Sequence, residues 1–336
     1  MPVLVTGASG MLGRAVATAI LARGHAVRTF QRGAADLPGA VDERGSLTDP
    51  AAVARAVEGC TAVVHLAAKV DVTGPEAEYR AVNVEGTRTL LAAARAAGVR
   101  RFVMVSSPSV AHVGSSIVGE PAGPADPARA RGPYARTKAA AELAALAADT
   151  PEMRVLAVRP HIVWGPGDTQ LVARVVDRAR RGRLPLLGGG TALIDTTYVD
   201  NAADALVAAL QAPADAWGGS YVVTNGEPRP VRDLLAGMCR AAGVPVPARS
   251  VPPGVARVAG AAIERVWAVR PQWGEPPMTR FVAEQMSTAH WFDQRRTREA
   301  LRWAPAVTLD EGFARLAAHL APAAAAPAPT SPEGRV

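Results

Sequence analysis

Cysteine, lysine and long apolar runs are scarce in this chain of 336 residues. The two cysteines, Cys60 and Cys239, stand far apart and have no partner at metal-ligand spacing, so we expect no metal site and a reducing compartment. No uninterrupted apolar window reaches the roughly 18 residues of a spanning helix. The opening Met1–Thr6 has no basic stretch before its apolar run, which argues against a signal peptide. We therefore expect a cytoplasmic protein without a transmembrane segment.

Basic residues are not clustered in any one part of the sequence. The 37 basic and 30 acidic residues give a net charge of +7, and the arginines alternate with acids along the chain. Nucleic-acid binding proteins gather basic residues on one face, so we expect no nucleic-acid partner. The hydrophobic content of 49% is that of an ordinary globular protein, and the length predicts about two domains.

The first half of the chain repeats short β-branched runs, glycine-containing turns and alanine-rich helical segments. This alternation predicts an α/β fold with a doubly wound parallel Rossmann sheet over residues 1–164. The expected strands are Val3–Thr6, Ala26–Phe30, Ala62–Leu66, Phe102–Ser106 and Val155–Val158.

The pattern loosens after Trp164 and predicts a smaller C-terminal substrate-binding domain. We assign residues 165–194 and 219–320 to it, with 195–218 returning to the Rossmann domain. Residues 321–336, rich in alanine and proline, are predicted to be a disordered tail. Apolar residues at helical spacing predict an amphipathic helix over Val255–Trp267, which could be a lid, a core element or a membrane-surface element.

A glycine-rich turn follows the first expected strand. Gly7, Gly10 and Gly13 stand three residues apart where the strand gives way to a helix. Such a turn lets a dinucleotide pyrophosphate approach the helix N-terminus, so we expect the turn, including Ser9, Met11 and Leu12, to bind a cofactor. The alternative is a plain strand–helix turn.

Arg32 follows the second expected strand, where a fold that prefers NAD carries an acid. A guanidinium there can pair with a 2′-phosphate, which favours NADPH (NADP) as the cofactor. The alternative is a solvated surface arginine.

Tyr134 and Lys138 stand four residues apart in an alanine-rich helical segment, so their side chains share one face. Lys138 is one of two lysines among 37 basic residues, which argues against a casual surface charge. An ammonium beside a phenol is expected to lower the phenol pKa and to prepare Tyr134 for proton transfer.

These motifs together resemble the extended short-chain dehydrogenase/reductase family. The resemblance implies a catalytic hydroxyl at Ser107, with Ser106 as the less favoured candidate. It also implies cofactor contacts at matching positions, which are Ala67, Ala68, Asn83, Tyr134, Lys138 and Pro160. At Ser46, next to Leu47, the family usually has an aspartate that contacts adenine, so we expect Ser46 and Leu47 near the adenine without that anchor.

Further motifs are similar to those of the 3β-hydroxysteroid dehydrogenase branch, and most of all to reductases of 2-alkyl-3-oxoalkanoic acids in bacterial olefin and β-lactone biosynthesis. They are Val105–Val110, Trp164–Asp168, Tyr198–Ala203, Asn225–Pro228 and His290–Phe292. The resemblance implies an NADP-dependent oxidoreductase that reduces the 3-keto group of a lipophilic β-keto acid. Nucleotide-sugar dehydratase chemistry is disfavoured, because Pro108–Ser109 stands where those enzymes have an Asp–Glu pair.

Substrate contacts are expected from Ser107, Pro108 and His112, with Arg280 as the partner of the substrate carboxylate. Apolar residues beyond the amphipathic helix would line the pocket, namely Trp273, Met278, Phe281, Met286, Trp291 and Phe292. A sterol or hydroxysteroid dehydrogenase and a non-catalytic NADP-binding regulator are the alternatives. A homodimer and association with other enzymes of the pathway are left open.

Overall fold

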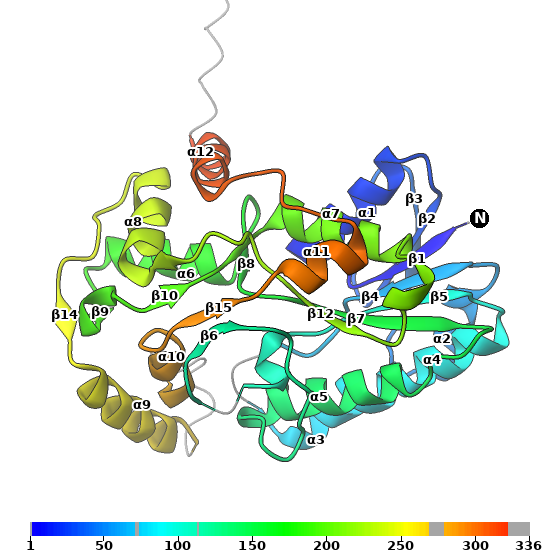
Figure 1. The fold of residues 1–336 in the computed structure, drawn as a ribbon, viewed down its shortest axis with the longest axis horizontal. Helices are drawn as coiled ribbons and strands as arrows, with labels where there is room; N and C mark the ends of the chain where they lie inside the picture. Colours follow the sequence, from blue (N-terminus) through cyan, green and yellow to red (C-terminus); the bar gives the residue numbers. More distant parts are fainter. Residues whose placement is uncertain (1, 71–73, 113, 269–278, 322–336) are drawn as a thin grey trace, which may run out of the picture.

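A computed structural model describes residues 2–70, 74–112, 114–268 and 279–321. Its centre is a seven-stranded sheet in the order β12-β7-β5-β4-β1-β2-β3, in which every neighbouring pair is parallel (Figure 1). The strands are β1 Val3–Thr6, β2 Val27–Gln31, β3 Ala40–Arg44, β4 Ala62–His65, β5 Arg101–Val105, β7 Arg154–Pro160 and β12 Ser220–Val223. The predicted doubly wound parallel sheet is confirmed.

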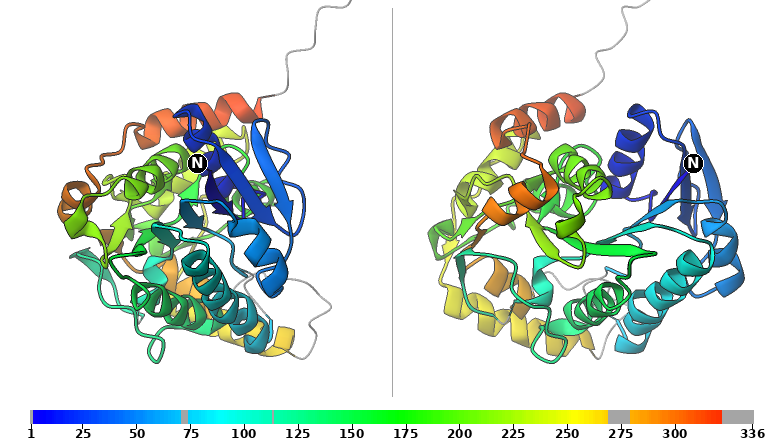
Figure 2. Two further views of the ribbon diagram at one scale, coloured as in Figure 1. Left: turned by 90° about the vertical axis from the view of Figure 1, so that its right-hand side faces the viewer. Right: turned by 45° about the vertical axis from the view of Figure 1, so that its right-hand side comes forward.

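Helices cover both faces of this sheet (Figure 2). Alternate residues of a strand point to opposite faces, so Val5 packs with α1 (Met11–Ala22) and α7 (Val199–Leu210). Leu4 packs on the other face with α2 (Pro50–Val57), α4 (Gly86–Ala96) and α5 (Gly132–Leu146). The two apolar layers hold the sheet rigid and leave the carboxyl ends of its strands to position a site.

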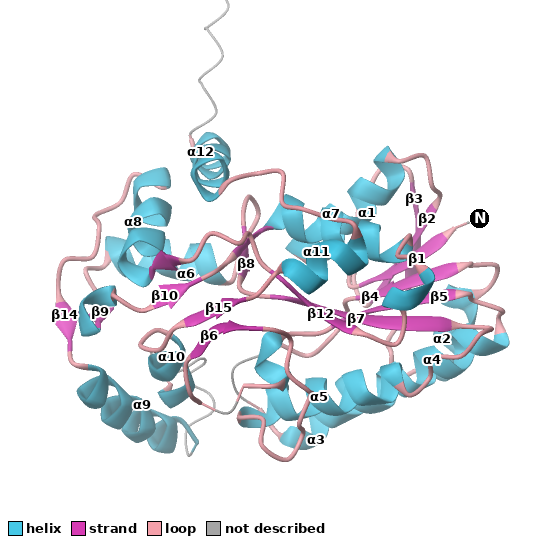
Figure 3. Cartoon of the chain, viewed as in Figure 1, coloured by secondary structure: helices cyan, strands magenta, loops and turns pink. Residues whose placement is uncertain are grey.

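The other elements lie mainly beyond one end of the sheet (Figure 3). A second sheet has the order β13-β10-β15-β6 and consists of Arg229–Pro230, Leu193–Ile194, His290–Phe292 and Ile117–Glu120. The two short pairs are β8 Val163–Trp164 with β11 Thr197–Tyr198, and β9 Leu186–Leu187 with β14 Ser250–Val251. The further helices and helical turns are α3 Glu76–Tyr79, η1 Arg80–Glu85, η2 Pro108–Val110, α6 Leu171–Arg180, η3 Gly188–Gly190, η4 Ala214–Ala216, α8 Val231–Ala241, α9 Pro253–Ala268, α10 Arg280–Gln285, α11 Arg295–Leu301 and α12 Leu309–Leu320.

The structure corrects one expectation about the second half and narrows another. The strand β12, which we had placed in the smaller domain, is the edge strand of the central sheet and pairs with β7. The helix α9 forms as expected, but most of its apolar stripe faces solvent, with Val255 57%, Val258 73% and Val266 45% exposed. Ala256 is buried instead, so this stripe is not a core element.

In the described part of the chain, every helix is too short or too polar to cross a bilayer.

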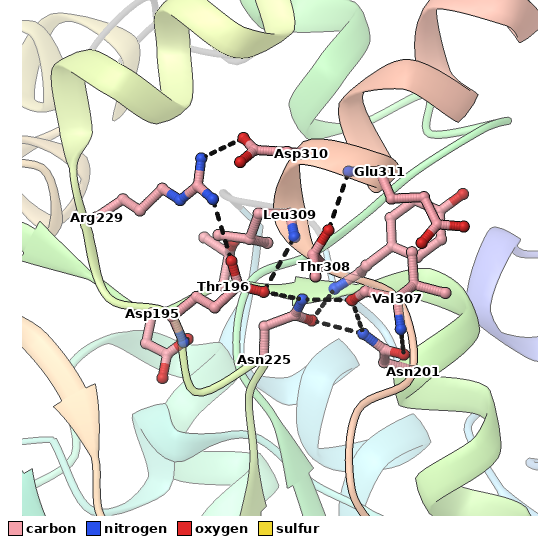
Figure 4. Close-up of polar contacts among 12 residues, drawn as sticks. Asp195, Thr196, Asn201, Asn225, Arg229, Val307, Thr308, Leu309, Asp310 and Glu311 are labelled. Atoms are coloured by element: carbon pink, nitrogen blue, oxygen red, sulfur yellow. Dashed lines mark hydrogen bonds and ion pairs between the residues drawn. The ribbon is translucent and has the colours of Figure 1, made fainter.

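Asn201 of α7 and Asn225, just after β12, bind the segment that leads into α12 (Figure 4). The Asn201 Oδ1 atom accepts from the backbone N–H groups of Ala306 and Val307, each at 3.0 Å, and its Nδ2 donates to the Val307 carbonyl at 2.7 Å. Asn225 Nδ2 donates to the same carbonyl at 2.9 Å. Two motifs that carry the family resemblance thus attach the C-terminal part of the chain to the central sheet.

Candidate active site

The turn between β1 and α1 requires glycine at Gly7 and Gly13 and leaves open space at Gly10. Gly7 has a φ of +76°, and a Cβ on Gly13 would overlap the Gly7 carbonyl. Gly10 is the N-cap of α1 without a side-chain cap, and a Cβ there would meet only the Gly7 carbonyl oxygen at 3.6 Å. Ser9 and Gly10 are exposed, whereas Met11 and Leu12 are partly buried. The open helix N-terminus fits a pyrophosphate group.

A chain of hydroxyl and imidazole groups holds this turn against the loop after β4. Thr6 Oγ1 accepts from the amides of Leu66 and Ala67 at 3.1 and 3.0 Å, so it donates to His65 Nδ1 at 2.8 Å. His65 Nε2 then donates to Thr87 Oγ1 at 3.0 Å. Burial lowers the His65 pKa to about 3, so the ring stays neutral and the chain keeps its direction.

Asn83 is buried in η1 and uses its amide on the protein. Its Oδ1 accepts from the Lys69 backbone N–H at 2.7 Å, and its Nδ2 donates to the Lys69 carbonyl and to Thr137 Oγ1, each at 3.1 Å. Asn83 therefore joins the loop that contains Ala67 and Ala68 to α5. We interpret it as a positioning residue for the expected cofactor loop.

Arg32 lies just past the end of β2 and is exposed. In the described part of the chain its side chain forms no hydrogen bond or ion pair. Arg14 of α1 is a second cation near this loop that the sequence motifs did not indicate, and it donates to the backbone carbonyls of Ala35 and Asp36. These bonds fasten the loop after β2 to α1.

Ser46 and Leu47 occupy the next loop, after β3. Ser46 Oγ bonds to Thr48 Oγ1 at 2.7 Å and accepts from the Thr48 amide at 3.2 Å, whereas Leu47 is buried. The Ser46 hydroxyl is thus engaged by its own loop, and Leu47 joins the apolar layer below.

Ser107 follows β5, and its hydroxyl lies close enough to the Tyr134 phenol to lower the pKa of that phenol. It is also the N-cap of η2, where its Oγ accepts from the Ser109 amide at 3.3 Å and from Ser109 Oγ at 3.0 Å. Ser106 is buried, and its Oγ has no partner among the described residues. The hydroxyl that meets Tyr134 therefore belongs to Ser107, and Pro108 follows it, buried at the start of η2.

The pKa of Tyr134 differs from our expectation. Burial raises it to about 12, and the nearby Ser107 hydroxyl lowers it only in part. The expected lowering by Lys138 is wrong for this structure: desolvation of the phenolate is the largest cause of the shift, and the Lys138 ammonium donates to the Val105 carbonyl. The phenol is therefore protonated at neutral pH, which suits a proton donor.

Lys138 lies one helical turn after Tyr134, and its Nζ donates to the Val105 carbonyl at 2.6 Å. Burial lowers its pKa to about 8, against the opposing effect of Glu142. Glu142 itself forms a buried ion pair with Arg159, in which Arg159 Nε donates at 2.9 Å. This pair joins α5 to β7, so that Pro160, the last residue of β7, stands at the same edge of the sheet as Val105.

His112 belongs to a group of three buried histidines that we had not foreseen. Its ring packs edge-on against His290 of β15, with centroids 4.8 Å apart, and His161 packs against His290 at 6.1 Å. Burial lowers the pKa of His161 to about 4 and that of His290 to about 3, so both are neutral at pH 7. His112 thus faces the second sheet.

Four of the residues expected at the substrate pocket lie outside the described part of the structure, namely Trp273, Met278 and the side chains of Arg280 and Phe281.

Fold and site together define an oxidoreductase of the extended short-chain dehydrogenase/reductase class. Residues 3–224 match the NAD dependent epimerase/dehydratase family, and the chain belongs to that family. It is 41% identical over 329 residues to a 2-alkyl-3-oxoalkanoate reductase of Stenotrophomonas maltophilia, which covers 96% of this chain and 100% of the relative.

Two other relatives are informative. A 3-beta-hydroxysteroid dehydrogenase of Mycolicibacterium neoaurum is 36% identical over 245 residues, 67% of this chain and 65% of the relative. Among solved structures, MoeE5 in complex with UDP-glucose and NAD superimposes with a TM-score of 0.72 at 25% identity, covering 95% of this chain and 98% of that one. The similarity to the 2-alkyl-3-oxoalkanoate reductase over its whole length, together with the similarity to the 3-beta-hydroxysteroid dehydrogenase, confirms the expected branch of the family.

Proposed function

We propose that this protein reduces the 3-keto group of a 2-alkyl-3-oxoalkanoic acid to the 3-hydroxy acid, with NADPH as the reductant. The observation that carries the proposal is the placement of the Ser107 hydroxyl and the protonated phenol of Tyr134 at the carboxyl ends of the strands, where Lys138 ties α5 to the end of β5 and the glycine-rich turn opens. The similarity over the whole length of the 2-alkyl-3-oxoalkanoate reductase supports the choice of substrate.

The residues divide the chemistry among them. Bound NADPH would supply a hydride to the ketone carbon. Ser107 holds the ketone oxygen with its hydroxyl, and Tyr134 gives that oxygen a proton as it becomes an alkoxide. Lys138, with a pKa of about 8, keeps a positive charge near the reacting groups in a large part of the molecules at neutral pH. Solvent then restores the proton of Tyr134.

The preference for the phosphorylated cofactor rests on Arg32. An exposed guanidinium directly after β2 fits a 2′-phosphate, and no acid occupies that position to hold a ribose hydroxyl. The pyrophosphate would lie on the backbone of Gly7–Gly13 at the start of α1. Ala67, Ala68 and Pro160 line the same edge of the sheet and would border the cofactor.

The elements outside the central sheet would form the substrate wall. We propose residues 165–194 and the part of 219–320 beyond β12 for this role, with Pro108 and His112 on the side of Ser107. Arg280 is proposed as the partner of the substrate carboxylate, because a buried carboxylate needs a cationic partner.

The test is NADPH oxidation by the purified protein with a racemic 2-alkyl-3-oxo acid, its methyl ester and a 3-oxosteroid. We expect turnover of the acid. Turnover of the steroid alone would establish the second candidate, a hydroxysteroid dehydrogenase, which the similarity to the Mycolicibacterium neoaurum enzyme favours. No turnover with any ketone would leave a cofactor-binding regulator, and equal rates for acid and ester would remove Arg280 from the proposal.

A further inference from the structure

Two adjoining cavities lie at the amino-terminal ends of the strands of the central sheet. Because the seven strands are parallel, these ends lie opposite the carboxyl ends, where Ser107 and the glycine-rich turn stand. The larger cavity has a volume of about 710 Å³ and the smaller about 360 Å³, and Arg100 and Arg101 line both. The two arginines therefore stand at the junction of the cavities, remote from the chemistry proposed above.

The larger cavity is basic. Arg100, Arg101 and Arg154 line it, together with a single carboxylate, Glu152. Arg154 is paired with Asp149, at 3.0 Å from Nε to Oδ1, so its charge is already balanced. The charges that face an incoming ligand are thus those of Arg100 and Arg101 against that of Glu152.

Arg101 is held in place, whereas Arg100 is available. Arg101 Nη1 donates to the Leu210 carbonyl, the last of α7, at 3.0 Å. The carboxyl end of a helix carries partial negative charge and would repel an anion, and Arg101 offsets that charge. Arg100 is exposed, and its side chain forms no hydrogen bond or ion pair with any described residue. One fixed and one available guanidinium can hold a carboxylate between them.

The smaller cavity is mainly apolar. Half of its ten lining residues are apolar members of the core layer that includes α1 and α7, namely Val3, Ile20, Ala62, Val207 and Leu210. Its polar lining consists of His25, Thr61 and Gln211 besides the two arginines. An apolar cavity that opens beside paired cations matches a molecule with a hydrocarbon chain and a single anionic head.

We propose that this edge of the sheet binds an amphiphilic acyl anion, with the chain in the smaller cavity and the carboxylate on Arg100 and Arg101. The site does not depend on the proposed reaction, because it shares no residue with the cofactor turn or with the Ser107–Tyr134 pair. It would be occupied while the cofactor is bound at the opposite edge.

The experiment is calorimetric titration of the NADPH-saturated protein with decanoate. Inorganic phosphate, an anion without a chain, and 1-octanol, a chain without a charge, are the comparison ligands. Arg100→Glu reverses the available charge, and Gln211→Trp, at an exposed position, fills the mouth of the smaller cavity. Arg240→Glu, on the exposed side of α8, makes the same change of charge away from both cavities.

We expect Arg100→Glu and Gln211→Trp each to weaken decanoate binding about tenfold or more, and Arg240→Glu to leave it within about twofold. NADPH affinity, measured by fluorescence, should stay unchanged in all three variants and shows that they fold. The proposal would be overturned if decanoate bound every variant with equal affinity. It would also be overturned if decanoate still competed with the keto acid in Arg100→Glu, because the fatty acid would then bind in the substrate pocket. Phosphate or octanol binding as tightly as decanoate, or no binding of decanoate, would overturn it as well.

Discussion

Replacing Tyr134 by phenylalanine isolates one hydroxyl group. The ring and its packing remain, and Ser107 keeps its two contacts with Ser109, so no buried partner is left without a hydrogen bond. We therefore expect the free energy of unfolding to fall by no more than about 1 kcal/mol. The reaction, in contrast, loses its proton donor, which corresponds to a decrease in kcat of about 10² or more, or about 2.7 kcal/mol of activation free energy.

The matched control is Tyr221→Phe. Tyr221 donates to the Ala216 carbonyl at 2.7 Å, away from the candidate active site, and its loss leaves that carbonyl with the longer bond from the Gly219 amide at 3.4 Å. This variant should lose about 1 kcal/mol of stability and keep its kcat. Single-turnover NADPH oxidation with a 2-alkyl-3-oxo acid and urea unfolding measure the two effects. A kcat of Tyr134→Phe within tenfold of the wild type would refute the assignment.

The pH dependence tests the same reasoning in another way. Because burial raises the Tyr134 pKa to about 12, the phenol keeps its proton throughout the usual assay range. Between about pH 6 and pH 9 the rate of reduction should show no ionisation of this residue. A decrease of kcat with rising pH in that range that disappears in Tyr134→Phe would mean that the pKa is lowered in the working enzyme.

Three further variants test separate parts of the structure. Ser107→Ala should reduce kcat by a factor on the order of 10–10³. Ser106→Ala removes a buried hydroxyl without a partner among the described residues and should leave kcat unchanged. A larger loss of kcat in Ser106→Ala than in Ser107→Ala would assign the catalytic hydroxyl to Ser106. Arg32→Asp should shift the ratio of kcat/KM for NADPH over NADH about tenfold or more toward NADH, and a wild type that uses both equally would reduce Arg32 to a surface charge. Asn201→Ala should lower the urea-derived free energy of unfolding by about 2–4 kcal/mol, because it leaves the polar groups of Val307 short of partners; a loss below about 0.5 kcal/mol would contradict the role of this contact.

Much of the candidate site could be predicted because its signals are local. The spacing of Gly7, Gly10 and Gly13 reflects one turn, and Tyr134 and Lys138 share a helix face by their separation alone. Such features are determined by a few residues that are close in the sequence, so the sequence of one strand–helix unit is enough to predict them. The choice of Ser107 over Ser106 as the catalytic hydroxyl stays a prediction that rests on the family resemblance.

Features that join distant segments depended on the tertiary structure. Hydrophobic periodicity correctly predicted a helix near Val255–Trp267, but periodicity states only that one face is apolar and not what covers it, and most of that stripe is exposed. The strand Ser220–Val223 found its place beside β7 through hydrogen bonds to a segment about 60 residues earlier, which no local pattern encodes. The pKa of Tyr134 was misjudged for the same reason. The lysine one helical turn away is visible in the sequence, whereas the desolvation that raises the pKa arises only when the surrounding elements pack together.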